Sequence, residues 1–295
     1  MSLFSGFGKK NAPQQAEEKK PPAAPQEVKE PEGGEKKEPG AGEKKAPVHE
    51  ETEFLLAKTT HCPVCDASFR ARTVKSGRAR RLPPDFDLRP RFLGIDTNKY
   101  DVVSCPNCGY TAMNRYFGAL SGGQIKLVRQ EVCSKFKKGA SASDDTLAAY
   151  TYEEAISRYK LAVYCTEVKK GKLSEIAYEH LKISWLYRGL LEKLAASDET
   201  DDEAAQKAQK LEMEYYNQAY EEFIKAIASE DFPMCGMDES TMNLLLASMA
   251  CRIGKYDVAA KLVSTILTSH VASYSVKDRA RDLKEEILMK RQEAK

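Results

Sequence analysis

Four of the eight cysteines stand in two matched pairs, CPVC at residues 62–65 and CPNC at residues 105–108. A two-residue gap lets both thiolates of one tight turn reach a single ion, while backbone N–H groups of the turn bond the sulfurs. Two such turns supply the closed tetrahedral ligand set of a structural zinc site. We therefore predict one structural Zn²⁺ ion held by Cys62, Cys65, Cys105 and Cys108.

Two other uses of the same cysteines stay open at this stage. Iron binds four thiolates in a rubredoxin-like site, and one pair alone could act as a redox dithiol. A redox CxxC pair is usually found beside a βαβ pattern, which the sequence lacks. A closed four-thiolate site has no open coordination position, which argues against zinc-dependent hydrolysis. Gly109 directly follows the second pair and is expected to adopt the positive φ that such a turn needs.

Several arginines lie between the two cysteine pairs. Residues 69–74 and 78–82 are predicted to form two strands of a hairpin, joined by a turn at Ser76-Gly77. This pairing places like charges opposite each other, which is unfavourable unless an anion such as a nucleic-acid phosphate compensates them. The hypothesis is an anion or nucleic-acid contact made by Arg70, Arg72, Arg78, Arg80 and Arg81. A hairpin face exposed to water is the simpler interpretation.

The sequence carries no nucleophile–base motif, phosphate-binding loop, GxGxxG or HExxH. Asp85 and Asp87 lie two residues apart in a Pro-flanked loop, and we expect them to face solvent rather than to form an acid/base pair. We predict that the protein is not an enzyme.

The part of the chain after the second cysteine pair shows the periodicity of α-helices, with apolar residues three and four apart. The predicted helices span residues 117–136, 144–170, 172–196, 203–229, 239–253, 256–268 and 276–294. The second is expected to be capped by Ser143 or Asp144.

A small–large–small pattern recurs in three of these helices. It occurs at Ala155, Tyr159 and Ala162, at Ala219, Phe223 and Ala226, and more loosely at Ala259, Val263 and Ile266. Such spacing is typical of the second helix of a tetratricopeptide repeat, although the intervals here depart from the 34-residue period. The predicted fold is therefore mainly α, a tetratricopeptide-like helical superhelix after an N-terminal four-cysteine zinc ribbon. A plain helical bundle is the alternative.

Single residues within the helical part carry further expectations. His180 lies on an apolar stripe and is expected to be a core residue. Trp185, the only tryptophan, lies off that stripe and is expected to contact a second neighbouring helix. Four cysteines form no close pair and are expected to pack as small apolar residues, namely Cys133, Cys165, Cys235 and Cys251. Of these, Cys235, in a loop between Pro233 and Gly236, is the one expected to be exposed and reactive.

Composition divides the chain into three parts. Residues 1–50 are rich in Pro, Lys and Glu and are predicted to be disordered. A zinc ribbon with a basic hairpin is predicted for residues 51–118, and a tetratricopeptide-like helical domain for residues 119–295. With 46 Lys and Arg against 44 Asp and Glu, the chain lacks the charge excess of strongly basic nucleic-acid binders. No run approaches the roughly 18 apolar residues of a membrane span, so we expect a cytoplasmic protein without membrane insertion.

The order of these motifs resembles that of an uncharacterised bacterial family, the domain of unknown function 2225. The resemblance rests on both cysteine pairs, on Asp85-Phe86-Asp87, on residues 98–102, and on residues 181–188, which are similar to the family's "iAWlyR" helix. It would cover about residues 54–293. It implies a zinc ribbon followed by tetratricopeptide-like helices in a bacterial cytoplasmic protein, without a known activity. Residues 89–92, Arg-Pro-Arg-Phe, depart from the aromatic pair that the family often shows there.

These observations favour a non-enzymatic adaptor or scaffold with a structural zinc site. Its protein partner is expected to bind the helical domain, whose many tyrosines suit a peptide-binding surface. The alternative is a nucleic-acid-binding protein that uses the arginines of the ribbon, and a lesser alternative is a thiol redox module.

Overall fold

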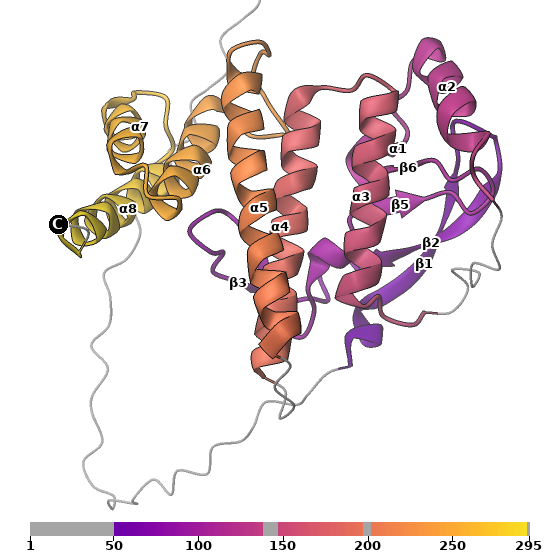
Figure 1. The fold of residues 1–295 in the computed structure, drawn as a ribbon, viewed down its shortest axis with the longest axis horizontal. Helices are drawn as coiled ribbons and strands as arrows, with labels where there is room; N and C mark the ends of the chain where they lie inside the picture. Colours follow the sequence, from indigo (N-terminus) through magenta and orange to yellow (C-terminus); the bar gives the residue numbers. More distant parts are fainter. Residues whose placement is uncertain (1–49, 138–146, 197–201, 294–295) are drawn as a thin grey trace, which may run out of the picture. The chain divides into compact units, whose positions relative to one another are not determined.

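The computed structural model describes residues 50–137, 147–196 and 202–293. Three antiparallel strand pairs come first and the long helices follow (Figure 1). The predicted class, helices after a small β region, is confirmed. The predicted disordered tail, apart from Glu50, lies outside the described residues.

The strands pair in chain order, β1 with β2, β3 with β4 and β5 with β6. They are β1 (Leu55–His61), β2 (Ser68–Val74), β3 (Arg81–Leu82), β4 (Arg91–Phe92), β5 (Val102–Ser104) and β6 (Thr111–Met113). The CPVC turn joins β1 to β2 and the CPNC turn joins β5 to β6. Each cysteine pair is thus the connection of its own hairpin.

The predicted pairing of residues 69–74 with 78–82 is wrong. In the structure Arg72 lies opposite Ala57 of β1, and Arg81 lies opposite Phe92 of β4. The physical reason is that β1 offers β2 a partner with small and β-branched side chains, whereas the predicted pairing sets arginines against one another. Gly77 does adopt a positive φ of 73°, as a turn residue, but the residues that follow it do not pair with β2.

The described part of the chain contains eight α-helices. They are α1 (Asn114–Phe117), α2 (Gly122–Val128), α3 (Tyr152–Val168), α4 (Leu173–Ala195), α5 (Asp202–Ile227), α6 (Glu239–Arg252), α7 (Tyr256–Thr268) and α8 (Tyr274–Glu293). The last five agree with the predicted ranges to within two residues, and α2 continues into a π-helical turn over Arg129–Cys133.

The first two predicted helices are wrong in their extent. Residues 117–136 are divided because Ser121 starts a new helix with a capping box, in which its hydroxyl accepts from the Gln124 N–H at 3.3 Å. Similarly, α3 starts where Thr151 accepts from the Glu154 N–H at 3.1 Å. The predicted cap at residues 143–144 lies outside the described residues.

Helix α4 lies between two apolar clusters. Leu181 and Trp185 pack with residues of α5, α6, α7 and α8, whereas Ile183 and Leu186 pack with α3 and β6. Figure 1 shows α3, α4 and α5 side by side, with α6, α7 and α8 beyond α5. The expectation that Trp185 contacts a second set of helices is confirmed.

The small–large–small pattern marks buried helix faces. All nine of its residues are at most 2% exposed. The spacing therefore identifies the packed face of α3, α5 and α7. The tetratricopeptide arrangement itself stays a prediction, and so do the domain boundaries.

A third apolar cluster joins the strand region to the helices. It contains Val64 and Tyr110 beside the cysteine turns, Val128 and Val132 of the α2 segment, and Cys165 of α3. Residues 47–295 accordingly form one compact unit.

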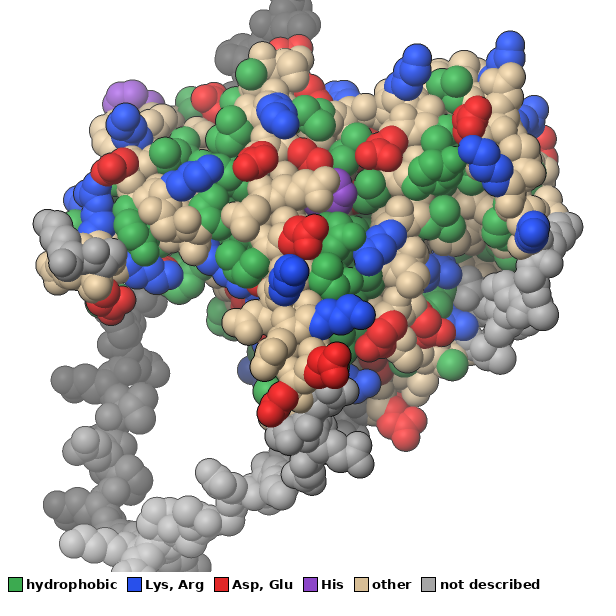
Figure 2. All heavy atoms as spheres, viewed as in Figure 1, with side chains coloured by type: hydrophobic (Ala, Val, Ile, Leu, Met, Phe, Trp, Pro, Cys, Tyr) green, Lys and Arg blue, Asp and Glu red, His purple; other side chains and the backbone are tan. Residues whose placement is uncertain are grey.

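The helices carry both charge signs on their exposed sides. On the face drawn in Figure 2, acidic and basic side chains are interspersed with apolar ones. Among the described helices, none is both long and apolar enough to cross a membrane.

Candidate metal centre

The four predicted ligands converge. The sulfur atoms of Cys62, Cys65, Cys105 and Cys108 all lie within 4.8 Å of one another. The Sγ atoms of Cys62 and Cys108 are 3.7 Å apart, and those of Cys65 and Cys105 are 3.6 Å apart. Sulfurs at ~2.3 Å from a tetrahedral metal ion are about 3.8 Å apart, whereas a disulfide bond is about 2.05 Å long. The spacing therefore suits a metal ion, and these residues could hold one.

The two cysteine turns have the same backbone geometry. The Asp66 N–H donates to the Cys62 carbonyl at 3.0 Å, and the Gly109 N–H donates to the Cys105 carbonyl at 2.9 Å. The donor residue has a positive φ in both turns, 60° at Asp66 and 79° at Gly109, which confirms the expectation for Gly109. A Cβ atom on Gly109 would also lie 2.4 Å from the Phe136 ring. Asp66 adopts a similar φ in the first turn, so the close approach of Phe136 is the stronger reason for glycine at position 109.

The four sulfurs affect one another's ionisation. Hydrogen bonding with Cys108 and Cys62 lowers the pKa of Cys105, and the same contacts raise the pKa values of Cys62 and Cys108. Thiolates this close repel one another, so all four can be ionised together only with a cation between them.

Neighbouring side chains fix the two turns. The Arg129 guanidinium donates twice to the Val64 carbonyl, at 2.8 and 2.5 Å, so that the π-helical turn holds the first cysteine turn. The Asn107 amide donates to Cys65 Sγ at 3.3 Å. A fifth cysteine, Cys133 at the end of the π-helical turn, interacts with Cys108 from outside the set of four.

The five predicted anion-binding arginines do not share one face. Arg70 and Arg72 lie on β2, while Arg81 lies on β3 in a different strand pair. The Arg72 guanidinium stacks over the Tyr150 ring, 4.2 Å from its centroid. Arg78 and Arg80 are exposed in the loop between the pairs, and Arg78 lies 3.8 Å from the Glu53 carboxylate.

The expectation that both aspartates of the Asp85–Asp87 loop face solvent is wrong for Asp87. This residue is only 3% exposed and accepts from the Trp185 indole at 3.1 Å and from the Arg188 guanidinium at 2.7 Å. Burial opposes its ionisation, but the charge and hydrogen bonds of Arg188, the hydrogen bond from Trp185 and the charge of Arg252 together outweigh burial and lower the pKa of Asp87. Asp85 is half-buried, 3.3 Å from the same guanidinium.

The sequence analysis named both segments of this contact but did not predict that they meet. The Asp-x-Asp loop and the Trp-x-x-Arg segment of α4 are about a hundred residues apart, and only the fold brings them together. The contact continues to Glu212, which accepts from Arg188 at 3.2 Å and from Arg252 at 2.6 Å.

Two single-residue expectations have opposite outcomes. His180 is a buried residue, as expected, and its Nδ1 lies 2.7 Å from a Glu222 carboxylate oxygen. The expectation that Cys235 is exposed and reactive is wrong. Its thiol donates to the Ser174 carbonyl at 3.1 Å, and burial raises its pKa to about 11. The loop folds back onto α4, which covers the sulfur.

Comparison with known proteins identifies one family. The family model described as "Uncharacterized protein conserved in bacteria (DUF2225)" matches residues 55–287. No curated protein and no solved structure matches the chain significantly. The matched segment contains both cysteine turns, the Asp85–Asp87 loop and helices α1 to α7. The chain therefore belongs to the bacterial family of the domain of unknown function 2225.

Proposed function

We propose that this protein is a non-enzymatic zinc-binding adaptor of the bacterial cytoplasm that engages a protein partner through its C-terminal helices. The zinc ion has a structural role, because a closed set of four thiolates leaves no position for a substrate. It holds the two cysteine turns together and supports the helices that pack on them.

The observation that carries the partner-binding part is an apolar groove between α7 and α8. Its cavity has a volume of about 180 Å³. The walls are mostly aliphatic, from Ala260, Val263, Leu267, Ile287 and Leu288. Leu288 is 50% exposed, and its neighbour Met289 is 60% exposed. Exposed apolar surface of this kind is typical of interaction sites.

The charges at the rim of the groove favour one kind of occupant. Lys284 and Arg291 line it beside the aliphatic walls, and Arg291 already pairs with Asp257, so that the attraction for acidic residues rests on Lys284. A short amphipathic segment of a protein partner, with one or two aliphatic anchors and acidic residues beside them, complements both features. The predicted tetratricopeptide-like arrangement is consistent with the same proposal, because such helix pairs usually bind peptides.

The experiment is affinity capture from bacterial lysate with three versions of the full chain. Leu288→Asp places a charge in the groove, whereas Val271→Asp changes an exposed apolar residue outside it and serves as the control. We expect an identified protein that is retained by the wild type and by Val271→Asp and lost by Leu288→Asp. A synthetic peptide of its acidic amphipathic segment should then compete for binding.

Two results would overturn the proposal. One is equal recovery of every protein by all three versions. The other is recovery that disappears on nuclease treatment and falls steeply between low and physiological salt, which is the behaviour of a nucleic-acid-binding protein.

A further inference from the structure

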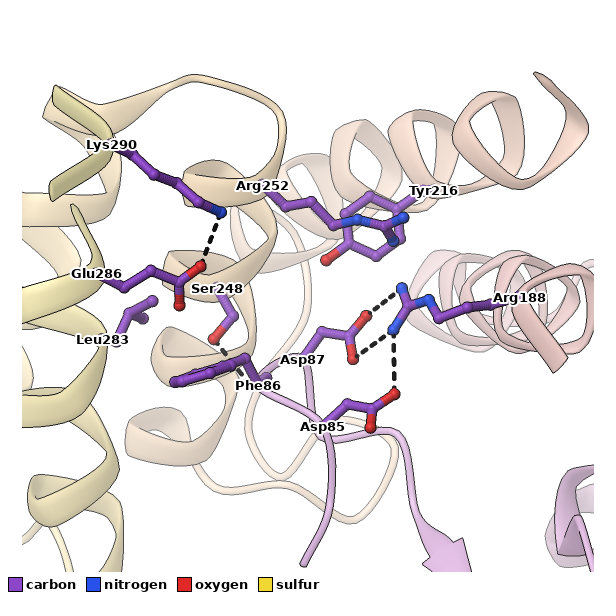
Figure 3. A pocket seen from close by; sticks show the side chains of 10 residues that line it. All are labelled: Asp85, Phe86, Asp87, Arg188, Tyr216, Ser248, Arg252, Leu283, Glu286 and Lys290. Atoms are coloured by element: carbon purple, nitrogen blue, oxygen red, sulfur yellow. Dashed lines mark hydrogen bonds and ion pairs between the residues drawn. The ribbon is translucent and has the colours of Figure 1, made fainter. Parts of the chain in front are cut away.

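A second cavity lies where the Asp85–Asp87 loop meets α4, α5, α6 and α8. Its volume is about 350 Å³, within the range of small-molecule sites. Figure 3 shows the side chains that line it, which come from five separate segments of the chain. This cavity is separate from both the cysteine cluster and the α7–α8 groove.

Each charged group around the cavity already has a counter-charge. Arg188 pairs with Asp87 at 2.7 Å, Arg252 pairs with Glu212 at 2.6 Å, and Lys290 pairs with Glu286 at 2.7 Å. A charged ligand would have to break one of these pairs and leave its partner uncompensated, which is strongly unfavourable when the partner is buried. The lining therefore favours a neutral ligand.

Two polar atoms in the lining lack a partner. The Tyr216 hydroxyl has no hydrogen bond to any described residue, although the side chain is 0% exposed, and it points into the cavity in Figure 3. The Arg252 guanidinium lies 4.5 Å from the centroid of the Tyr216 ring and interacts with its oxygen; because a guanidinium only donates hydrogen bonds, the Tyr216 O–H proton is still without an acceptor. Glu286 Oε2 is likewise buried without a partner. Buried polar groups are rarely left unpaired, and here one donor and one acceptor face the same space.

The remaining walls suit a ligand with an apolar face. Phe86 is 52% exposed, and Leu283 lies behind it in the lining. The Ser248 hydroxyl donates to the Phe86 carbonyl at 2.9 Å, which leaves its lone pairs able to accept. A ligand here meets hydrogen-bonding groups on one side and an aromatic ring on another.

We propose that this cavity binds a small neutral polyhydroxyl molecule of monosaccharide size. One ligand hydroxyl accepts from Tyr216, a second donates to Glu286, and the C–H face of the ligand rests on Phe86. Hydroxyl groups both donate and accept, so the ligand pairs both orphaned atoms and leaves the three ion pairs intact.

The test is isothermal titration of the full chain with D-glucose, D-galactose, D-ribose and myo-inositol, beside the charged analogues D-glucose 6-phosphate and D-glucosamine. We expect saturable binding of at least one neutral polyol. Tyr216→Phe and Glu286→Gln should each weaken it roughly tenfold, the usual loss for one hydrogen bond. Glu285→Gln, the exposed neighbour on α8, should leave it unchanged.

Three results would overturn the proposal. They are the absence of binding by all four neutral polyols, tighter binding of a charged analogue than of its neutral parent, and variants that bind as the wild type does. Circular dichroism of each variant establishes that it is folded before titration.

Discussion

Asp87 and Glu179 are both buried carboxylic acids, and their surroundings give them different charge states. The pKa of Asp87 is lowered, because Arg188, Trp185 and Arg252 together outweigh the effect of burial. Glu179 is 0% exposed, and burial together with the nearby Glu175 raises its pKa to about 9, despite the opposing charge of Lys169. Asp87 is therefore a charged partner in an ion pair, and Glu179 is a neutral hydrogen-bonding group at neutral pH.

The raised pKa of Glu179 predicts a pH-dependent stability. A carboxyl group that binds its proton more tightly in the folded state makes folding less favourable as pH rises between its unfolded and folded pKa values, here from 4.5 to about 9. Glu179→Gln should remove this pH dependence, which amounts to a loss of up to about 1.4 kcal/mol in the free energy of unfolding per pH unit. Urea unfolding of the wild type and the variant at pH 6 and at pH 8.5 measures the difference. The raised pKa of Glu179 would be contradicted if the free energy of unfolding of Glu179→Gln depended on pH as strongly as that of the wild type and of the exposed control Glu221→Gln.

The ion pair at Asp87 predicts a large loss of stability when one partner is removed. Asp87→Asn leaves the Arg188 guanidinium without its closest counter-charge, and such a change in a buried pair costs about 3–5 kcal/mol. Asp85→Asn is the matched control in the same loop, because this carboxylate is 30% exposed and 3.3 Å from Arg188. The control should lose about 1 kcal/mol or less. If urea unfolding showed the same loss of unfolding free energy in both variants, Asp87 would not be the residue that holds the loop to α4.

At the scale of the element, local signals set where the helices begin. The start of α3 depends on Thr151, whose hydroxyl and backbone N–H both bond Glu154. Thr151→Ala should cost about 1 kcal/mol, whereas Thr151→Ser keeps the accepting hydroxyl and should be near neutral. Thermal unfolding of the two variants compares them directly. A loss of the same size in both would show that the methyl group, not the cap, matters.

The elements also explain which parts of the structure could be predicted from the sequence. The cysteine turns were predictable because each depends on residues within five positions of one another, and α4 to α8 because their apolar periodicity is long. The pairing of β2 was not, since residues 55–61 carry a weak strand signal and the competing turn at Ser76-Gly77 has the stronger local signature. Neither the Asp87–Arg188 pair nor the burial of Cys235 can be recognised from neighbouring residues in the sequence, because both depend on segments distant in the chain.

At the scale of the whole molecule, the strand region is tied to α4 by ion pairs that each have one buried partner. Lys182 lies 2.8 Å from Asp101, Arg188 lies 2.7 Å from Asp87, and Arg89 lies 2.8 Å from Glu192. Together with the apolar cluster beside the cysteine turns, they make one packed unit of strands and helices. Loss of the metal ion should therefore destabilise the helices as well as the turns. Trp185 in α4 reports this as a fluorescence change on treatment with a zinc chelator.

The central claim is that the four convergent thiolates hold one structural zinc ion. The most direct test is the metal content of the purified chain, measured by mass spectrometry for the wild type, Cys62→Ser and Cys251→Ser. Cys251 is a buried cysteine of α6 in a different apolar cluster from the four converging sulfurs, so it controls for the general effect of replacing a thiol. We predict one zinc ion per chain in the wild type and in Cys251→Ser, and less than one in Cys62→Ser. Iron in place of zinc, a metal-free wild type, or a full zinc content in Cys62→Ser would contradict the account.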